Sequence, residues 1–305
     1  MEDYDSVENQ LSTIRDFIRF GMSELERGEV FFGHGTDNAL DEATAAVLHV
    51  LRLPHDLPGH FMESRLLTSE KKAVLTLIRR RVEERVPMAY LTNEAWFAGL
   101  KFFVDQRVLV PRSPIAELIE QQFEPWVEPE NVTRILDLCT GSGCIAIACA
   151  YQFPHASVDA ADISDEALAV AQRNIVDLGV EGQVEAICSD IFSGLKGQYD
   201  LIVSNPPYVD QSEIDAMPSE FHHEPILGLA SGNDGLDATR RILAKAEDFL
   251  NENGVLVVEV GASEEALVAA FPTIPFTWLE FARGGSGVFL LTKDQLTKNR
   301  VALRG

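Results

Sequence analysis

Four consecutive residues combine groups that could hold a planar, amino-bearing substrate: Asn205, Pro206, Pro207 and Tyr208. They follow segment 199–204, whose apolar pattern is typical of a buried strand. The two prolines fix φ and remove two backbone donors, so the Asn205 side chain and the Pro206 carbonyl remain as acceptors beside an aromatic ring. Sheets of α/β proteins place their sites in such loops. The alternative interpretation is a rigid turn after a strand.

A second segment, residues 135–146, has the pattern of a strand, a glycine-rich turn and a helix start. Gly141 and Gly143 allow a tight turn and let a ligand approach backbone amides at the helix N-terminus. The spacing Gly141-x-Gly143-x-x-Ala146 also satisfies the dinucleotide fingerprint, with Asp162 about 20 residues on to bind ribose hydroxyls. The segment predicts a nucleotide-like ligand and leaves its identity open.

Two carboxylates favour S-adenosylmethionine over a nicotinamide dinucleotide. Asp137 lies inside the first predicted strand, where it would repel a pyrophosphate but suit an amino-bearing ligand. Asp190 follows the third predicted strand, where it could accept from an adenine amino group while a nearby apolar side chain covers the ring. If the carboxylates only cap turns, an NAD-dependent oxidoreductase remains the alternative.

Methyl transfer from a sulfonium is an in-line displacement, so the protein must aim a nucleophile at the methyl carbon. An amide nitrogen is a weak nucleophile because its lone pair is delocalised into the carbonyl group. We expect Asn205 and Pro206 to accept both N–H bonds of such an amide, which would orient it and stabilise positive charge developing on nitrogen. Tyr208 would pack against the substrate's planar end, and Pro207 would keep the loop stiff. The same geometry accepts the exocyclic amino group of adenine or cytosine.

The distribution of charge distinguishes between these substrates. The formal net charge is −23 over 305 residues. Residues 113–305 hold 11 Lys and Arg against 30 Asp and Glu, a balance of −19, and residues 1–112 hold 14 against 18, a balance of −4. Nucleic-acid binding draws its affinity from neutralising phosphates, so this sign argues against it and favours a basic protein partner. Solubility alone is the alternative reason for the charge.

Composition excludes other broad classes. No run of about 18 uncharged apolar residues occurs, and residues 1–5 are acidic, so we expect a cytoplasmic protein with no membrane partner. We expect no metal site, because His222-His223-Glu224 lacks the HExxH spacing and the cysteines show no CxxC pattern. We expect buried, reduced thiols instead, at Cys139, Cys144, Cys149 and Cys188.

Further elements must position these sites, and residues 1–86 are predicted to form a helical domain. Apolar spacing predicts helices over 7–27, from a cap at Asn38 through Leu51, and over about 69–85. The third helix carries basic residues interleaved with glutamates, which predicts a solvated face. Those basic residues are Lys71, Lys72, Arg79, Arg80, Arg81 and Arg85.

Residues 87–114 are predicted to form a β-hairpin linker. Segments 96–104 and 107–110 have strand-like composition and flank a turn around Asp105-Gln106. Pro111 and Pro114 close the segment.

Residues 115–305 alternate strand and helix patterns. The predicted strands are 134–138, 157–162, 184–188, 199–204 and 255–260, and the predicted helices are 144–152, 164–178 and 238–250, the last stopped by Gly254. This alternation predicts a Rossmann-like α/β domain, with a mostly parallel sheet covered by helices on both faces. Strands over 276–281 and 287–291 would form a hairpin, giving seven strands with the last one antiparallel near the edge.

Together these motifs resemble the protein-glutamine methyltransferases, which methylate a glutamine side-chain nitrogen with S-adenosylmethionine and release S-adenosylhomocysteine. The resemblance rests on Asp137-x-x-x-Gly141-x-Gly143 followed by Asn205-Pro206-Pro207-Tyr208, behind a helical domain and a hairpin linker, and it covers nearly the whole chain. It implies a class I methyltransferase domain over residues 115–305.

The resemblance also implies roles for particular residues. The cofactor residues would be Asp137, Thr140, Gly141, Ser142, Gly143, Cys144, Asp162, Asp190, Ile191, Phe192 and Asn205. Related enzymes often have Trp where Ile191 stands, so packing against adenine would fall to Ile191 or Phe192. A loop near the substrate would include Arg112, Glu224 and Pro225, for which a solvent loop is the alternative.

Two branches of the family differ in their substrate. One acts on peptide-chain release factors, and the other on the third protein of the large ribosomal subunit. Segments 33–38 (Gly-His-Gly-Thr-Asp-Asn), 89–93 and 110–115 look like the ribosomal branch, whereas the release-factor branch usually reads Pro-Arg-Pro-Asp-Thr-Glu at 111–116. We therefore expect a basic ribosomal protein as substrate, docked by the helical domain. A release-factor methyltransferase and a non-catalytic ribosome-assembly factor are the alternatives.

Overall fold

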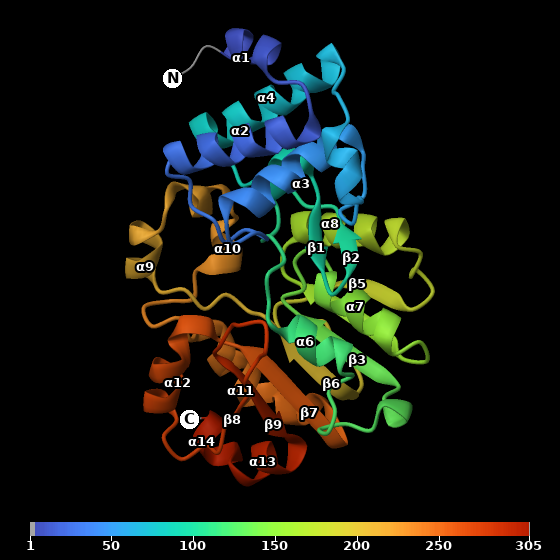
Figure 1. Ribbon diagram of the computed structural model, residues 1–305. Helices are drawn as coiled ribbons and strands as arrows, with labels where there is room; N and C mark the ends of the chain where they lie inside the picture. The colour runs from blue at the N-terminus through green and yellow to red at the C-terminus, as the bar shows by residue number, and fades with distance from the viewer. Residues whose placement is uncertain (1–3, 305) are drawn as a thin grey trace. The chain divides into compact units, whose positions relative to one another are not determined.

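The computed structural model describes residues 4–304, and the side chains of residues 6–210 and 213–304 (Figure 1). The chain divides into two compact units. The helical unit runs to Glu94 and also includes Pro218–His223, and the sheet unit contains Ala95–Met217 and the chain from Glu224 onward. Residues 1–3, the start of the predicted helical domain and of the acidic N-terminus, lie outside this description.

The helical unit is built from amphipathic helices whose apolar faces meet in one core. Phe17, Val47 and Ile78, from three different helices, are fully buried in that core. The elements of the unit are α1 (Tyr4–Gln10), α2 (Ile14–Arg27), α3 (Ala39–Leu51), η1 (Gly59–Glu63), α4 (Thr68–Glu84), α5 (Met88–Thr92) and η3 (Ser219–His223). The predicted cap at Asn38 is confirmed, because its side chain accepts from the Asp41 backbone N–H at 2.9 Å.

One prediction for this unit is wrong, and another holds only in part. The helix expected over 7–27 is two helices, because Thr13 is extended and its side chain forms a capping box with Asp16 at the start of α2. The solvated face expected on α4 holds for Lys72, but the Arg81 side chain is 0% exposed. The spacing of charged residues along one helix cannot show that carboxylates from distant segments surround the Arg81 guanidinium.

The hairpin lies earlier in the chain than predicted. Strands β1 (Ala95–Phe97) and β2 (Leu100–Phe102) pair antiparallel. Ala98 and Gly99 connect them with φ of 47° and 76°, as a tight hairpin turn with positive φ at both positions requires. Residues 107–110 are not a strand. Asp105 bonds the Arg107 backbone N–H at 3.1 Å and forms a local turn instead.

The sheet unit contains the predicted seven-stranded sheet, with strand order β5-β4-β3-β6-β7-β9-β8 (Figure 1). The strands are β3 (Arg134–Leu138), β4 (Ser157–Asp162), β5 (Val184–Cys188), β6 (Tyr199–Ser204), β7 (Leu250–Glu259), β8 (Thr277–Trp278) and β9 (Val288–Thr292). Strands β3 to β7 run parallel, and β9 pairs antiparallel with both β7 and β8. The α/β fold with an antiparallel last strand is thus confirmed, and β8 is the edge strand.

Helices cover both faces of this sheet because successive strand residues point to opposite sides. Leu201 and Val203 pack in the core beneath α6, α7 and α8, and Ile202 packs in the core beneath α11 to α14. The helices are α6 (Ile115–Glu120), α7 (Cys144–Gln152), α8 (Asp165–Asp177), α9 (Gln211–Ala216), α10 (Ile226–Leu229), α11 (Asp237–Phe249), α12 (Glu264–Ala270), α13 (Lys293–Lys298) and α14 (Arg300–Arg304), with 3₁₀ turns η2 (Pro129–Asn131) and η4 (Gly261–Ser263). Only α7, α8 and α11 had a helical signal strong enough to predict.

The prediction that Gly254 stops the preceding helix is wrong. Helix α11 ends at Phe249 and β7 begins at the next residue, so Gly254 lies within the strand. A Cβ at Gly254 would lie 3.0 Å from the Tyr199 carbonyl oxygen, next to the shift in register between β6 and β7. The glycine therefore serves a close approach of two backbones rather than a helix end.

Candidate active site

The register of the parallel strands brings the predicted site segments to one edge of the sheet. Leu138 is paired with Ala161 on one side and with Ser204 on the other. The glycine turn, Asp162 and Asn205 therefore start from adjacent strand ends. The Ser204 hydroxyl donates to the Leu138 carbonyl at 2.8 Å and holds two of these ends together. Strand order also reverses between β3 and β6, which is where open α/β sheets bind ligands.

The glycine turn keeps open space above its backbone. Gly141 has φ of 55°, and no described atom lies within 4 Å of a Cβ built there. At Gly143, with φ of 79°, a Cβ would come within 3.2 Å of the Ala171 side chain. Only glycine satisfies both positions without strain or crowding. The turn is therefore a cradle that a ligand can approach closely.

A residue that sequence reasoning missed supports this turn. Asn174, on α8, is 1% exposed and donates to the Ser142 carbonyl at 2.8 Å. It also bonds the backbone of Phe103 in both directions, at 2.7 and 3.0 Å. A buried asparagine on a helix whose other buried positions are mostly apolar was the available signal.

Asp137 lies buried at the base of the turn, and only one of its two carboxylate oxygens has a hydrogen-bond partner among the described residues. Its Oδ2 accepts from the Thr140 hydroxyl at 2.5 Å and from the Ala146 N–H at 3.0 Å. Its Oδ1 has no hydrogen-bond partner among the described residues. Burial raises the pKa of Asp137 from 3.8 to about 7, against the opposing effect of those two hydrogen bonds. A cationic or amino-bearing ligand in the cradle would relieve this cost.

Asp137→Asn should stabilise the ligand-free protein at alkaline pH. The pKa of Asp137 is raised on folding, so its contribution to stability is fully present below pH 3.8 and is lost as the pH rises through about 7. Asparagine carries no charge, so the melting temperature of the variant relative to wild type should increase from pH 5 to pH 8. Thermal unfolding at both pH values measures this. An equal difference at both values would contradict the assigned burial cost, and Asp215→Asn, at an exposed position, is the control.

Asp162 holds the glycine turn through both carboxylate oxygens. Oδ2 accepts from the Gly141 N–H and Oδ1 from the Ser164 N–H, each at 2.9 Å. Burial raises the pKa of Asp162. The next residue, Ile163, is 52% exposed at this edge of the sheet, so its apolar side chain is accessible to a ligand. Sequence reasoning missed Ile163, although its position directly after a strand end was visible.

The side chains of Asp190, Ile191 and Phe192 lie in three different environments. Arg241, on α11, forms an ion pair with Asp190 at 2.7 Å, and this bond lowers the pKa of the carboxyl. Phe192 is 3% exposed and stacks on Phe249 with ring centroids 4.5 Å apart, so its ring belongs to the core. Ile191 has φ of 54°, a strained value for a β-branched residue. Such strain is commonly found at ligand sites.

Tyr208 is held by a network that sequence reasoning missed. Its hydroxyl donates to Glu259 at 3.0 Å, and Ser113 donates to the other oxygen of the same carboxylate at 2.5 Å. The Tyr208 carbonyl accepts from the Ser263 hydroxyl at 2.8 Å. A Cβ at Gly261 would lie 2.5 Å from the ring. The ring is therefore fixed on several sides, and a carboxylate at the end of β7 was the signal that could have revealed Glu259.

Desolvation dominates the electrostatics of this network. Burial raises the pKa of Glu259 against its two hydrogen bonds. Burial and the neighbouring Glu259 raise the pKa of Tyr208, so its hydroxyl stays protonated as a donor. Asn205 is half-buried, Pro206 is buried and Pro207 is half-buried at the start of the same loop.

Arg112 and Glu224 form a bidentate ion pair within the sheet unit. Their two N–O distances are 2.6 and 2.8 Å, and Glu224 also accepts from the Val110 N–H at 3.1 Å. Glu224 is 3% exposed, whereas Pro225 is half-buried. Both charges influence the pKa of Tyr208. The pair therefore joins segment 110–112 to residue 224, in the loop that follows the tetrapeptide.

The cysteines are all free thiols, but they are not all buried as predicted. Cys144 and Cys149 are buried, Cys139 is half-buried and Cys188 is exposed at the end of β5. Burial raises the pKa of the Cys144 thiol to about 12, which keeps it unreactive beside the glycine turn. The described residues contain no group of three or more His, Cys, Asp or Glu side chains placed to hold a metal ion.

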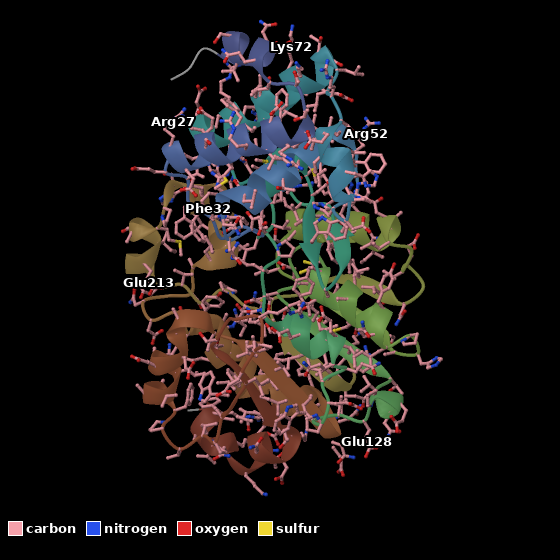
Figure 2. All side chains as sticks on the ribbon, viewed as in Figure 1. Arg27, Phe32, Arg52, Lys72, Glu128 and Glu213 are labelled. Carbon is pink, nitrogen blue, oxygen red and sulfur yellow. The ribbon has the colours of Figure 1, made fainter. Side chains whose placement is uncertain are left out.

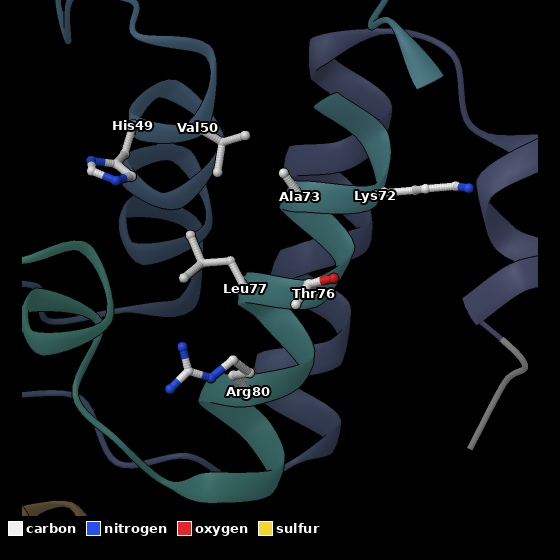
Figure 3. A pocket seen from close by; sticks show the side chains of 7 residues that line it. All are labelled: His49, Val50, Lys72, Ala73, Thr76, Leu77 and Arg80. Carbon is white, nitrogen blue, oxygen red and sulfur yellow. The ribbon is translucent and has the colours of Figure 1, made fainter. Parts of the chain in front are cut away.

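A groove on the helical unit, between α3 and α4, has no comparable chemistry (Figure 3). Two of its polar side chains already have partners, since His49 contacts Glu94 at 2.9 Å and Arg80 forms an ion pair with Glu84 at 3.0 Å. The groove is lined by His49, Val50, Lys72, Ala73, Thr76, Leu77 and Arg80.

Within residues 4–304, no helix is both long and apolar enough to cross a membrane.

Comparison with known proteins identifies the family to which this chain belongs. The chain is 51% identical over 298 residues to the ribosomal protein uL3 glutamine methyltransferase of Francisella tularensis, covering 97% of this chain and 95% of that protein. It is 52% identical over 294 residues to the protein of the same name from Neisseria gonorrhoeae, covering 96% and 98%. The chain belongs to the uL3 glutamine methyltransferase family. The nicotinamide alternative left open by the glycine spacing is thereby set aside.

The methyltransferase fold is supported by two further matches. The methyltransferase small domain family matches residues 121–224, which include the glycine turn and the tetrapeptide. The crystal structure of the hMettl16 catalytic domain in complex with the MAT2A 3'UTR hairpin 6 aligns with a TM-score of 0.50. At 18% identity over 73% of this chain and 80% of that one, the likeness shows the fold alone.

Proposed function

We propose that this methyltransferase transfers a methyl group from S-adenosylmethionine to the side-chain amide nitrogen of a glutamine in ribosomal protein uL3. The main structural support is the register that pairs Leu138 with Ser204. Because of this pairing, the open glycine turn and the loop that begins at Asn205 follow adjacent strand ends. Family membership supports the substrate, because the relatives carry uL3 in their names.

The residues at the sheet edge fit S-adenosylmethionine. Asp137 offers a buried acceptor oxygen without a described partner beneath the turn, and Gly141 leaves space for a ligand above it. Asp162 would face the ribose while it holds the turn, and Ile163 and Ile191 would cover the adenine ring. Asp190 would turn from Arg241 to accept from the adenine amino group. When bound, this cofactor supplies a methyl group on a sulfonium and leaves as S-adenosylhomocysteine.

The tetrapeptide would orient and polarise the glutamine amide. The Asn205 side-chain oxygen and the Pro206 carbonyl would accept its two N–H bonds, which stabilises positive charge as the nitrogen gains a methyl group. The nitrogen then loses one proton to water. Tyr208 would pack against the amide plane, and Glu259 and Gly261 keep its ring in one orientation.

The charge of the chain supports a basic protein partner. The net charge of −23 suits a ribosomal protein and opposes direct nucleic-acid binding. We further propose that residues 1–86 form a docking domain, that 87–114 form a linker and that 115–305 form the methyltransferase domain. A ribosomal protein as substrate implies a cytoplasmic location.

An assay with both candidate substrates tests the proposal. The purified chain is incubated with methyl-labelled S-adenosylmethionine and either uL3 or a peptide-chain release factor, and the labelled residue is located by mass spectrometry. We expect a methylated glutamine in uL3 and none in the release factor. Label in the release factor alone would contradict the substrate assignment, and no label in either would contradict the proposed reaction.

A further inference from the structure

The helical unit contains a buried ionic cluster that belongs to none of the residues assigned above. Arg81 is 0% exposed, and Glu42 and Glu220 are 1% and 2% exposed. The guanidinium bonds Glu42 at 2.7 Å, Glu220 at 3.1 Å and the Phe31 carbonyl at 2.7 Å. Charges buried this completely are held only where every partner is in place.

Glu220 is the member of this cluster that comes from far along the chain. It accepts from the Phe31 backbone N–H at 2.9 Å, which adds a second bond to the segment before α3. The next residue, Phe221, packs its ring against His34 and Phe31, with centroids 4.5 and 5.5 Å away. Segment Pro218–His223 therefore packs as part of the helical unit, although both ends of its loop lie in the sheet unit.

The same cluster explains the Gly33–Asn38 motif. The Thr36 hydroxyl donates to Glu42 at 2.9 Å, and the Gly33 N–H donates to the Thr36 carbonyl at 3.0 Å. These bonds shape the segment that presents Phe31 and His34 to Phe221. Its glycines at 33 and 35 have φ of 139° and 102°, so the turn requires them. The motif thus forms the surface against which residues 220–221 pack.

The loop that contains Glu220 begins directly after the tetrapeptide. We refer to residues 210–229 as the 210–229 loop. Its base is closed independently of Glu220, because Val209 pairs with Ala230 and donates to the Leu229 carbonyl at 2.9 Å. Glu224 is held by Arg112. Release of Glu220 would therefore free the middle of the loop and leave Tyr208 in its network.

The 210–229 loop has the composition of a surface for a basic protein. Residues 210–229 contain five Asp and Glu and no Lys or Arg. Glu220 and Glu224 are buried, whereas Glu213 and Asp215 are exposed. Glu213 projects from α9 as an exposed carboxylate (Figure 2). On α10, Ile226 and Leu227 are 67% and 59% exposed, which gives apolar contact area beside the acidic residues.

We propose that Glu220 is a positioning residue, which anchors the 210–229 loop to Arg81 and Phe31 so that the loop presents a preformed docking surface to the basic substrate protein. This inference rests on the proposed function. An anchored loop loses little conformational entropy when the substrate binds, whereas a released loop must be ordered at that moment. The anchor therefore acts on substrate affinity and not on the methyl-transfer step.

Glu220→Ala tests the anchor with a split between KM and kcat. We expect the KM for uL3 to rise by about tenfold, as the cost of ordering several loop side chains predicts. We expect kcat at saturating uL3 and the affinity for S-adenosylmethionine to stay at wild-type values. Phe221→Ala, which removes the ring contacts, should act in the same direction, and Glu220→Gln, which keeps the shape and an acceptor, should recover part of the loss. Glu181→Ala changes an exposed carboxylate outside the 210–229 loop and is the matched control.

Limited chymotrypsin digestion provides a readout that needs no substrate. Cleavage after Phe221 should be faster in Glu220→Ala than in wild type and unchanged in Glu181→Ala. Unchanged cleavage would overturn the anchor, and so would an unchanged KM or a fall in kcat alone. If wild-type protein methylates no uL3, the proposed function fails, while digestion still decides whether the anchor exists.

Discussion

Asn205→Ala should lower kcat for glutamine methylation by about 10²- to 10³-fold, the usual cost of losing one hydrogen-bonding group that stabilises a transition state. The variant keeps the prolines and the Tyr208 network, so the loop retains its shape. What it loses is the side-chain oxygen that would accept an N–H bond from the substrate amide. Single-turnover measurement with saturating uL3 and labelled S-adenosylmethionine isolates this step from binding.

The matched control for this variant is Asn131→Ala. Asn131 is an exposed asparagine on η2 whose side chain bonds Glu128 at 2.5 Å. Its replacement should leave kcat unchanged. If Asn205→Ala retained the wild-type rate, the tetrapeptide would be a rigid turn, and the acceptor role would have to be assigned to other groups.

Arg81→Met should lower the free energy of unfolding by about 3–5 kcal/mol, as expected when one partner of a buried ion pair is removed. The methionine fills part of the volume but leaves Glu42 and Glu220 buried without their guanidinium. Arg85, the other cation near Glu220 at 3.5 Å, is 31% exposed in its side chain and cannot replace three bonds. Urea unfolding followed by circular dichroism measures the change.

The neighbouring arginine on α4 provides the comparison. Arg80 is 48% exposed in its side chain and pairs with Glu84 one helical turn away. An exposed pair of this kind contributes little to stability, so Arg80→Met should be nearly neutral. Equal destabilisation by the two variants would show that the loss comes from helix propensity or charge in general, and not from the buried cluster.

The elements with strong local periodicity were predictable. The predicted β3, β4, β5 and β6 match the structure end to end, and so does α7. Each contains several apolar residues and is bounded by turn residues, so local sequence determines it. The hairpin was misplaced because several strand-like runs overlap there, and the positive φ at Ala98 and Gly99 decided the turn.

The short helices after residue 205 were not predictable. Helices α9, α10 and α12 have four to seven residues each, too few for a periodic signal. They are stable only where tertiary contacts hold them. The same reason explains why Glu259 and Asn174 were missed, since a single polar residue inside an apolar element shows its role only when its partners are known.

The sequence by itself determined which polar residues and glycines follow the ends of the strands. The glycine turn follows β3, Asp162 ends β4, Asp190 follows β5 and Asn205-Pro206-Pro207-Tyr208 follow β6, and parallel strands bring their carboxyl ends together. Only the tertiary structure decided which residues hold Tyr208 and the loop that follows it in place. The Glu259 network around Tyr208 and the Glu220 anchor on Arg81 join positions 51 and 139 residues apart, and no local pattern encodes contacts over such separations.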